Sequence, residues 1–339
     1  MTLPTEDRNE LIRSIQRGVP LEPRPFASIA QGLGSTEKAV IECLRELKRE
    51  EILREISAVL EGSLLGYRSA LAAGSIPGSR IDAVAEIVSA HPTVSHNYLR
   101  NHHYNLWFTI AVPLEMSLER TLELLAKEAG VDGFRALCRT HVFKIGVNFD
   151  PDSLKNRTEV TRSSNLEAVE VGPREAQLFR ALQTPLPLVE RPFDELAGGI
   201  DASAEELLDF AKCHLGGAVR RYVGTLRHRK LGVKENVMVV WRVADDAVQA
   251  AGELLARAPE VSHCYARNPV PNFPYTLYSM VHGPSRESCH EIARELSSQT
   301  GLYDYAVLFS EREFKKQRLR YFLPELDGWW RERNWGHPR

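Results

Sequence analysis

The chain repeats itself, and this repeat constrains its fold more than any other feature. Gln16–Ala30 and Gln183–Ala197 share seven of fifteen positions at an offset of 167, and His91–Asn101 and Ala258–Asn268 share seven of eleven at the same offset. Farther along, the offset becomes 171, so the second half carries four extra residues within Pro269–Pro274. A repeat of this length indicates two copies of one structural unit. The 339 residues therefore predict two homologous halves in tandem.

Each half opens with a helix-turn-helix pattern. Apolar spacing, a glycine stop and the capping sequence Ser35-Thr36-Glu37-Lys38 predict a helix, a short helix, a tight turn and a longer helix. The helices are expected at Glu6–Gln16, Phe26–Leu33 and 36–50, and again at Arg174–Gln183, Phe193–Gly199 and Ser203–Leu215.

In the rest of each half the hydrophobic period changes. The segments there predict elements in the order β-α-β-β-α-β, which is the order of a ferredoxin-like domain. In the first half these elements are expected at Tyr67–Ile76, Ser79–Ala90, Thr93–Asn101, Tyr104–Val112, Ser117–Ala129 and Phe134–Phe143. In the second half they are expected at Glu235–Val243, Asp246–Ala256, Glu260–Arg267, Tyr275–His282, Arg286–Thr300 and Tyr303–Ser310. The fold class is α+β.

The repeat also sets domain boundaries. We expect helix-turn-helix domains at 1–57 and 172–224, ferredoxin-like domains at 58–150 and 225–310, a polar linker at 151–171 and a basic, aromatic tail at 311–339. The tail holds Trp329, Trp330 and Trp335, which suggests that it packs on another part of the chain.

Composition excludes several classes of protein. A net charge of −2 gives no general attraction to nucleic acid or anionic membranes. No apolar stretch is long enough to span a bilayer, and the polar N-terminus does not resemble a signal peptide. Five scattered cysteines argue against a disulfide framework, so a cytoplasmic location is expected. Motifs for phosphate loops, dinucleotide binding, zinc hydrolysis and serine nucleophiles are absent from the sequence.

The third helix of each helix-turn-helix pattern is acidic. Residues 36–51 sum to a charge of −1, from four basic and five acidic side chains, and Ser203–Leu215 sums to −2. Acidic recognition helices repel phosphates, so we expect no nucleic-acid partner.

Three histidines of the second half are expected at one edge of its sheet. In a ferredoxin-like sheet of order 4-1-3-2, the starts of strands 1 and 2 and the end of strand 3 share one rim. His228 precedes strand 1, His263 begins strand 2 and His282 ends strand 3, whereas the first half keeps only His96 of this set. We therefore expect the principal site in the second half, since imidazoles suit proton transfer near neutral pH.

Two resemblances follow from these patterns. The order of helix-turn-helix and ferredoxin-like domains resembles the leucine-responsive/AsnC regulators, which form dimers through their sheets. Longer motifs, HNYLRNHHYNLWFT from His96, FKIGVNFD from Phe143, HRKLGVKENVMVVW from His228, HCYARNPVPNFPYTLYSMVHG from His263 and REFKKQRLRYF from Arg312, resemble the siroheme decarboxylase family. This resemblance implies that both subunit types of that enzyme are fused here as an intrachain pseudo-dimer.

The resemblance implies removal of carbon dioxide from two acetate side chains of siroheme, with no cofactor beyond the iron of the substrate. Siroheme is the implied partner, and a homodimer is left open. The implied catalytic histidines are His102, His228, His263 and His282, with His102 carried across to the other half on a hairpin tip. The implied substrate-binding residues are Arg100, Arg221, Arg229, Tyr265, Arg267, Tyr275 and Lys315. The alternative is a tetrapyrrole- or amino-acid-sensing transcriptional regulator of the leucine-responsive/AsnC family.

Overall fold

A computed structural model describes residues 3–145, 167–227 and 235–334. The described chain divides into two compact units, and each unit combines parts of both sequence halves. The first unit contains residues 3–65 and 167–227, and the second contains residues 66–145 and 235–334. The expected linker at 151–171 lies largely outside the described residues.

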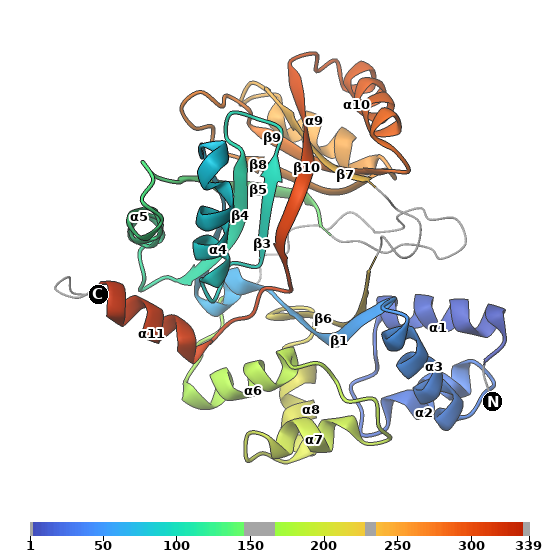
Figure 1. The fold of residues 1–339 in the computed structure, drawn as a ribbon. Coiled ribbons are helices and arrows are strands. Elements are labelled where there is room, and N and C mark those ends of the chain that lie inside the picture. The colour runs from blue at the N-terminus through green and yellow to red at the C-terminus, as the bar shows by residue number, and fades with distance from the viewer. Residues whose placement is uncertain (1–2, 146–166, 228–234, 335–339) are drawn as a thin grey trace. The chain divides into compact units, whose positions relative to one another are not determined.

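The first unit contains both helix-turn-helix domains (Figure 1). Its helices are α1 (Thr5–Arg17), α2 (Pro25–Gly32), α3 (Glu37–Arg49), α6 (Pro173–Gln183), α7 (Pro192–Gly198) and α8 (Ala204–Cys213). The Thr36 hydroxyl accepts a hydrogen bond from the Ala39 amide, and Ser203 caps α8 in the same way, so the predicted capping residues begin both third helices.

A strand from each half joins the two domains of this unit. β1 (Leu53–Leu60) pairs antiparallel with β6 (Val219–Leu226), and a short 3₁₀ turn at Gly62–Leu65 follows β1. Two equivalent backbone bonds attach the segments that precede the second helices: Val19 N donates to Tyr222 O at 2.8 Å, and Leu186 N donates to Ile56 O at 2.7 Å. These bonds show that the two domains are related by pseudo-two-fold symmetry.

The second unit is an eight-stranded closed barrel. The first half supplies β2 (Tyr67–Gly74), β3 (His96–Arg100), β4 (Leu106–Pro113) and β5 (Arg135–Lys144). The second half supplies β7 (Glu235–Trp241), β8 (Val261–Arg267), β9 (Leu277–Gly283) and β10 (Tyr305–Lys316). Within each half the strand order is the expected 4-1-3-2, which gives β5-β2-β4-β3 and β10-β7-β9-β8.

The two sheets join along their edges. β3 pairs with β10 and β5 pairs with β8, so each half completes the hydrogen bonding of the other half's edge strands. The two sheets, through which the regulators form dimers, are here joined at their edges into one closed barrel. The intrachain pseudo-dimer itself is confirmed.

Helices cover the outside of the barrel (Figure 1). These are α4 (Ile81–Ala90) after a 3₁₀ turn at Gly78–Arg80, α5 (Leu118–Ala129), α9 (Val248–Arg257) and α10 (Arg286–Thr300). Each half has its own apolar core between its helices and strands. A third cluster, which includes Trp107, Met238, Phe273 and Tyr278, draws residues from both halves and fills part of the barrel interior.

The segment predicted as a tail is ordered in two parts. β10 continues six residues past the predicted end at Ser310, because that extension pairs with β3. After it, α11 (Pro324–Arg333) packs Leu326, Trp329 and Trp330 into the core of the first half, and the Trp329 ring lies 4.4 Å from that of His91. Within the described ranges, no helix has the length and apolar character needed to cross a membrane.

Candidate active site in the barrel

The same motif, V-S-H-x-Y-x-R-N, lies on β3 and on β8. Side chains alternate along a strand, and the intervening residues face the helices: Asn97 donates to the Ala85 carbonyl of α4, and Cys264 belongs to the outer core of the second half. The His, Tyr and Arg of each motif therefore face the barrel interior. They are His96, Tyr98 and Arg100 in one half and His263, Tyr265 and Arg267 in the other.

The two arginines make equivalent contacts across the junctions between the halves. Arg100 Nη1 donates to the Leu308 carbonyl of β10 at 2.7 Å, and Arg267 Nη1 donates to the Leu137 carbonyl of β5 at 2.8 Å. Each guanidinium also lies over the tyrosine two residues before it, at 5.5 Å from Tyr98 and 5.3 Å from Tyr265.

Neither arginine has a carboxylate partner within the described part of the chain, and the Nε atom of each is buried without a hydrogen-bond acceptor. Burial lowers the pKa of Arg100 to about 10 and also lowers the pKa of Arg267. A buried, unpaired cation destabilises a fold, so a pair of them indicates a place built for an anion.

The surroundings of the two arginines differ. Arg267 lies opposite Arg139 in the pairing of β8 with β5, whereas Arg100 lies opposite Ser310 in the pairing of β3 with β10. Like charges facing each other across two strands repel. The pairing of β8 with β5 therefore places two arginines opposite each other, whereas Arg100 faces an uncharged residue.

His263 and His282 meet through a serine hydroxyl. Ser262 Oγ lies 2.9 Å from His263 Nδ1 and 2.7 Å from His282 Nε2, and its distance to the Met280 carbonyl is longer, at 3.5 Å. The hydroxyl carries one hydrogen, so when it donates to one imidazole it accepts from the other. Desolvation and the charge of Lys316 lower the pKa of His282 to about 4, so His282 is neutral at pH 7. The expected convergence of these two histidines is thus found.

The first half has only part of this arrangement. Ser95 Oγ lies 2.9 Å from His96 Nδ1, as in the second half, but Ala111 occupies the position equivalent to His282. His96 pairs instead with Lys316 in the β3–β10 ladder. The linked imidazole pair is therefore a feature of the second half.

His102 reaches the other half but at a different place from the one expected. Its ring packs against that of Phe273 at 5.1 Å, and the Tyr104 amide donates to its Nδ1 at 3.1 Å. Phe273 follows the end of β8, so this contact lies at the opposite end of that strand from His263. Tyr275 packs on Phe273 in the same cluster, at 4.9 Å. The structure does not bring His102 and Tyr275 to the Ser262-linked pair.

Two other predicted residues, Lys315 and Arg221, lie elsewhere. Lys315 donates to the carbonyls of Ser89 and His91 at the end of α4, because register shifts in β10 turn it toward the outside of the barrel. Arg221 lies on β6 in the first unit, where it lines a pocket. His228 and Arg229 fall outside the described residues.

The sequence was compared with known families and structures. The AsnC-like ligand binding domain matches residues 64–144 and 230–315, and the siroheme decarboxylase NirDL-like HTH domain matches residues 8–54 and 175–212. A siroheme decarboxylase of Hydrogenobacter thermophilus is 37% identical over 326 residues, which cover 96% of this chain and 97% of that protein. The chain belongs to the siroheme decarboxylase family.

Two further siroheme decarboxylases support the fused architecture. A siroheme decarboxylase β subunit of Methanosarcina barkeri is 37% identical and covers 43% of this chain with 97% of its own length. The crystal structure of the siroheme decarboxylase NirDL in co-complex with an iron-uroporphyrin III analogue matches 96% of this chain and 98% of that one, with 34% identity and a TM-score of 0.77. One chain here thus has the extent of two such subunits.

Residues that the sequence did not nominate also line this siroheme decarboxylase barrel. Tyr98 lies beneath the Arg100 guanidinium, Ser262 contacts both His263 and His282, and Arg139 lies opposite Arg267. The eight-residue motif shared by 94–101 and 261–268 was the available signal, because identity in both halves at V-S-H-x-Y-x-R-N marks equivalent positions. Within the described ranges, no group of three or more metal-ligating side chains occurs.

Proposed function

We infer that this chain is a siroheme decarboxylase, which releases carbon dioxide from acetate side chains of siroheme. The observation that carries this function is the pair of buried arginines without carboxylate partners in a barrel whose sequence belongs to that family. Siroheme carries many carboxylates, so its binding supplies the charges that the arginines lack.

Arg100 and Arg267 bind carboxylates that do not react. Each arginine is held by a carbonyl of the opposite half, and each keeps its Nε buried and unbonded. A prearranged donor of this kind binds a carboxylate without reorganisation, since the cost of desolvation is met during folding. The interior tyrosines, Tyr98 and Tyr265, offer flat apolar surface for the macrocycle.

The linked histidines supply the proton. Loss of carbon dioxide breaks the bond between the carboxyl carbon and the methylene carbon, and the electron pair stays on the methylene carbon until it is protonated. One histidine of the His263–His282 pair donates this proton. The other passes its own N–H proton to it through the Ser262 hydroxyl and is then reprotonated from solvent. Each decarboxylation thus exchanges one carbon dioxide for one proton and converts an acetate into a methyl group.

The reaction as written is redox-neutral and consumes only protons. We therefore propose that it needs no cofactor, and that the iron is the one that siroheme itself carries. The electron-withdrawing macrocycle accepts part of the developing negative charge, while the protein fixes its orientation.

Anaerobic incubation with siroheme, without added cofactor, tests this function. Mass spectrometry of the extracted tetrapyrrole should show loss of two carbon dioxide units. Unchanged siroheme, together with tight and sequence-selective binding to operator DNA, would support a regulator instead.

A further inference from the structure

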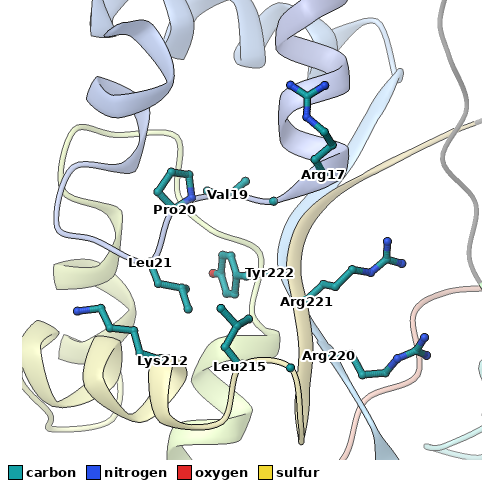
Figure 2. A pocket seen from close by; sticks show the side chains of 11 residues that line it. Arg17, Val19, Pro20, Leu21, Lys212, Leu215, Arg220, Arg221 and Tyr222 are labelled. Carbon is teal, nitrogen blue, oxygen red and sulfur yellow. The ribbon is translucent and has the colours of Figure 1, made fainter. Parts of the chain in front are cut away.

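A cationic cavity lies in the first unit, between the two helix-turn-helix domains. It has a volume of about 650 Å³ and is lined by the segment after α1, the end of α8 and the start of β6 (Figure 2). Its lining includes four cations, Arg17, Lys212, Arg220 and Arg221, and no acidic residue.

The cations of this cavity are only partly neutralised. Arg17 pairs with Glu10 at 2.6 Å, Arg220 approaches Glu61 at 3.8 Å and Lys212 approaches Asp209 at 3.4 Å. Arg221 has no carboxylate within 4 Å among the described residues, although much of it is removed from water, which lowers its pKa. Its charge therefore lacks a partner within the part of the chain that the structure describes.

The pseudo-symmetric position in the other domain makes different contacts. The position equivalent to Lys212 is Arg45, whose Nη2 donates at 2.9 Å to the carbonyl of Leu188, the residue equivalent to Leu21. That bond ties α3 to the segment after α6. Lys212 makes no such bond to Leu21 in the described structure. No side-chain bond from Lys212 therefore joins α8 to the segment that follows α1. Glu55 occupies the position equivalent to Arg221, so the cation there is also particular to this side.

Charge and apolar surface alternate across the cavity. In Figure 2, Lys212 lies on one side of Leu215 and Tyr222, and Arg220 and Arg221 lie on the other. Leu215 is 51% exposed, so its side chain supplies apolar surface between these cations. A ligand that fills this space needs anionic groups at both ends and an apolar middle.

We propose that this cavity is a second binding site for a tetrapyrrole polycarboxylate, in a different unit from the barrel. The volume is far larger than a single phosphate or acetate needs, and it falls in the range of sites for medium-sized organic ligands. Cations drawn from three separate elements favour several dispersed carboxylates over one compact phosphate group. The ligand class is that of the proposed substrate, but the site stands on its own cavity and charges.

Equilibrium dialysis of the full chain with iron-uroporphyrin III tests this proposal. We expect two equivalents per chain. Lys212→Glu should weaken one of them by about tenfold or more, because it removes one charge-assisted contact and adds a repulsive charge. The Lys212 side chain is 53% exposed, so the substitution leaves the fold intact. Siroheme and its decarboxylated product, used as competitors, show which of the two the cavity prefers.

Arg49→Glu is the matched control, since Arg49 is an exposed cation of the same unit that does not line the cavity. It should keep both equivalents. The double variant Arg100→Met/Arg267→Met should lose the barrel equivalent and keep the one that responds to Lys212→Glu. A single equivalent in the wild type, or two equivalents unchanged in Lys212→Glu, would overturn the second site. Displacement of the Lys212-dependent equivalent by ATP at lower concentration than by uroporphyrin would overturn its assignment to a polycarboxylate.

Discussion

The Nε2 atom of His282 lies 2.7 Å from the hydroxyl oxygen of Ser262. This contact joins β8 and β9 of the second half at the barrel interior. The same hydroxyl contacts His263, so two imidazoles share one hydrogen-bonded chain. The first half repeats the serine and one histidine but has Ala111 in place of the other. This difference is the basis on which we propose the proton-transfer role for the second half.

Replacement of His263 or His282 by Gln should lower kcat by at least about tenfold, because general acid catalysis by a placed side chain contributes about 100-fold or more. His228→Gln is expected to act in the same direction, and His96→Gln should be milder. Anaerobic turnover of siroheme measures the effect, and circular dichroism checks the fold. If His96→Gln is the most damaging of the four, the site does not lie in the second half.

The buried arginines should show opposite effects on stability and on binding. Arg267→Met removes an unpaired buried cation, so the ligand-free chain should be stabilised by about 1 kcal/mol. The same change should raise the KM for siroheme at least tenfold, because a charge-assisted contact is lost. Thermal unfolding and steady-state kinetics give the two readouts. A lower melting temperature together with an unchanged KM would show that Arg267 is structural.

The repeat offset predicted most elements well, because both halves carry the same hydrophobic pattern. The strand expected at Tyr67–Ile76, for example, is observed at Tyr67–Gly74. Closure of the barrel could not be predicted, since it depends on which sheet edges meet, and Glu311–Lys316 has the charged sequence of a solvated tail. Two register shifts in β10 also interrupt the alternation of inward-facing and outward-facing side chains. Lys315 therefore donates to a carbonyl at the end of α4 and does not face the interior.

Acid should destabilise the second unit through its buried histidines. Burial lowers the pKa of His91 to about 3, against about 6.5 in an unfolded chain. The unfolded state therefore binds more protons than the folded state between these pH values. The contribution of neutral His91 to folding stability is complete above pH 6.5 and is lost as the pH falls toward 3. At pH 5, protonation of His91 in the unfolded chain lowers the free energy of unfolding by about 2 kcal/mol.

The melting temperature of the wild type should therefore fall between pH 7 and pH 5, and His91→Asn should reduce the size of that fall. His103→Asn is the control, because His103 is exposed at the β3–β4 turn. An equal fall in the wild type and in His91→Asn would show that His91 is not the group that titrates.

The helix-turn-helix domains should not read DNA. On α3, Arg49 pairs with Glu42 at 3.1 Å, and Arg45 donates to the Leu188 carbonyl of the other domain. These contacts occupy two cations of an already acidic helix. We expect no sequence-specific duplex binding at physiological salt, as measured by a mobility shift. A sequence-selective shift at nanomolar protein would contradict this expectation.

A structure of the chain determined anaerobically with siroheme is the most direct test of the barrel as the active site. The macrocycle should lie in the barrel, with carboxylates within hydrogen-bond distance of Arg100 Nε and Arg267 Nε and one acetate facing the His263–His282 pair. A barrel empty of tetrapyrrole at saturating siroheme, with both Nε atoms still unbonded, would contradict this assignment.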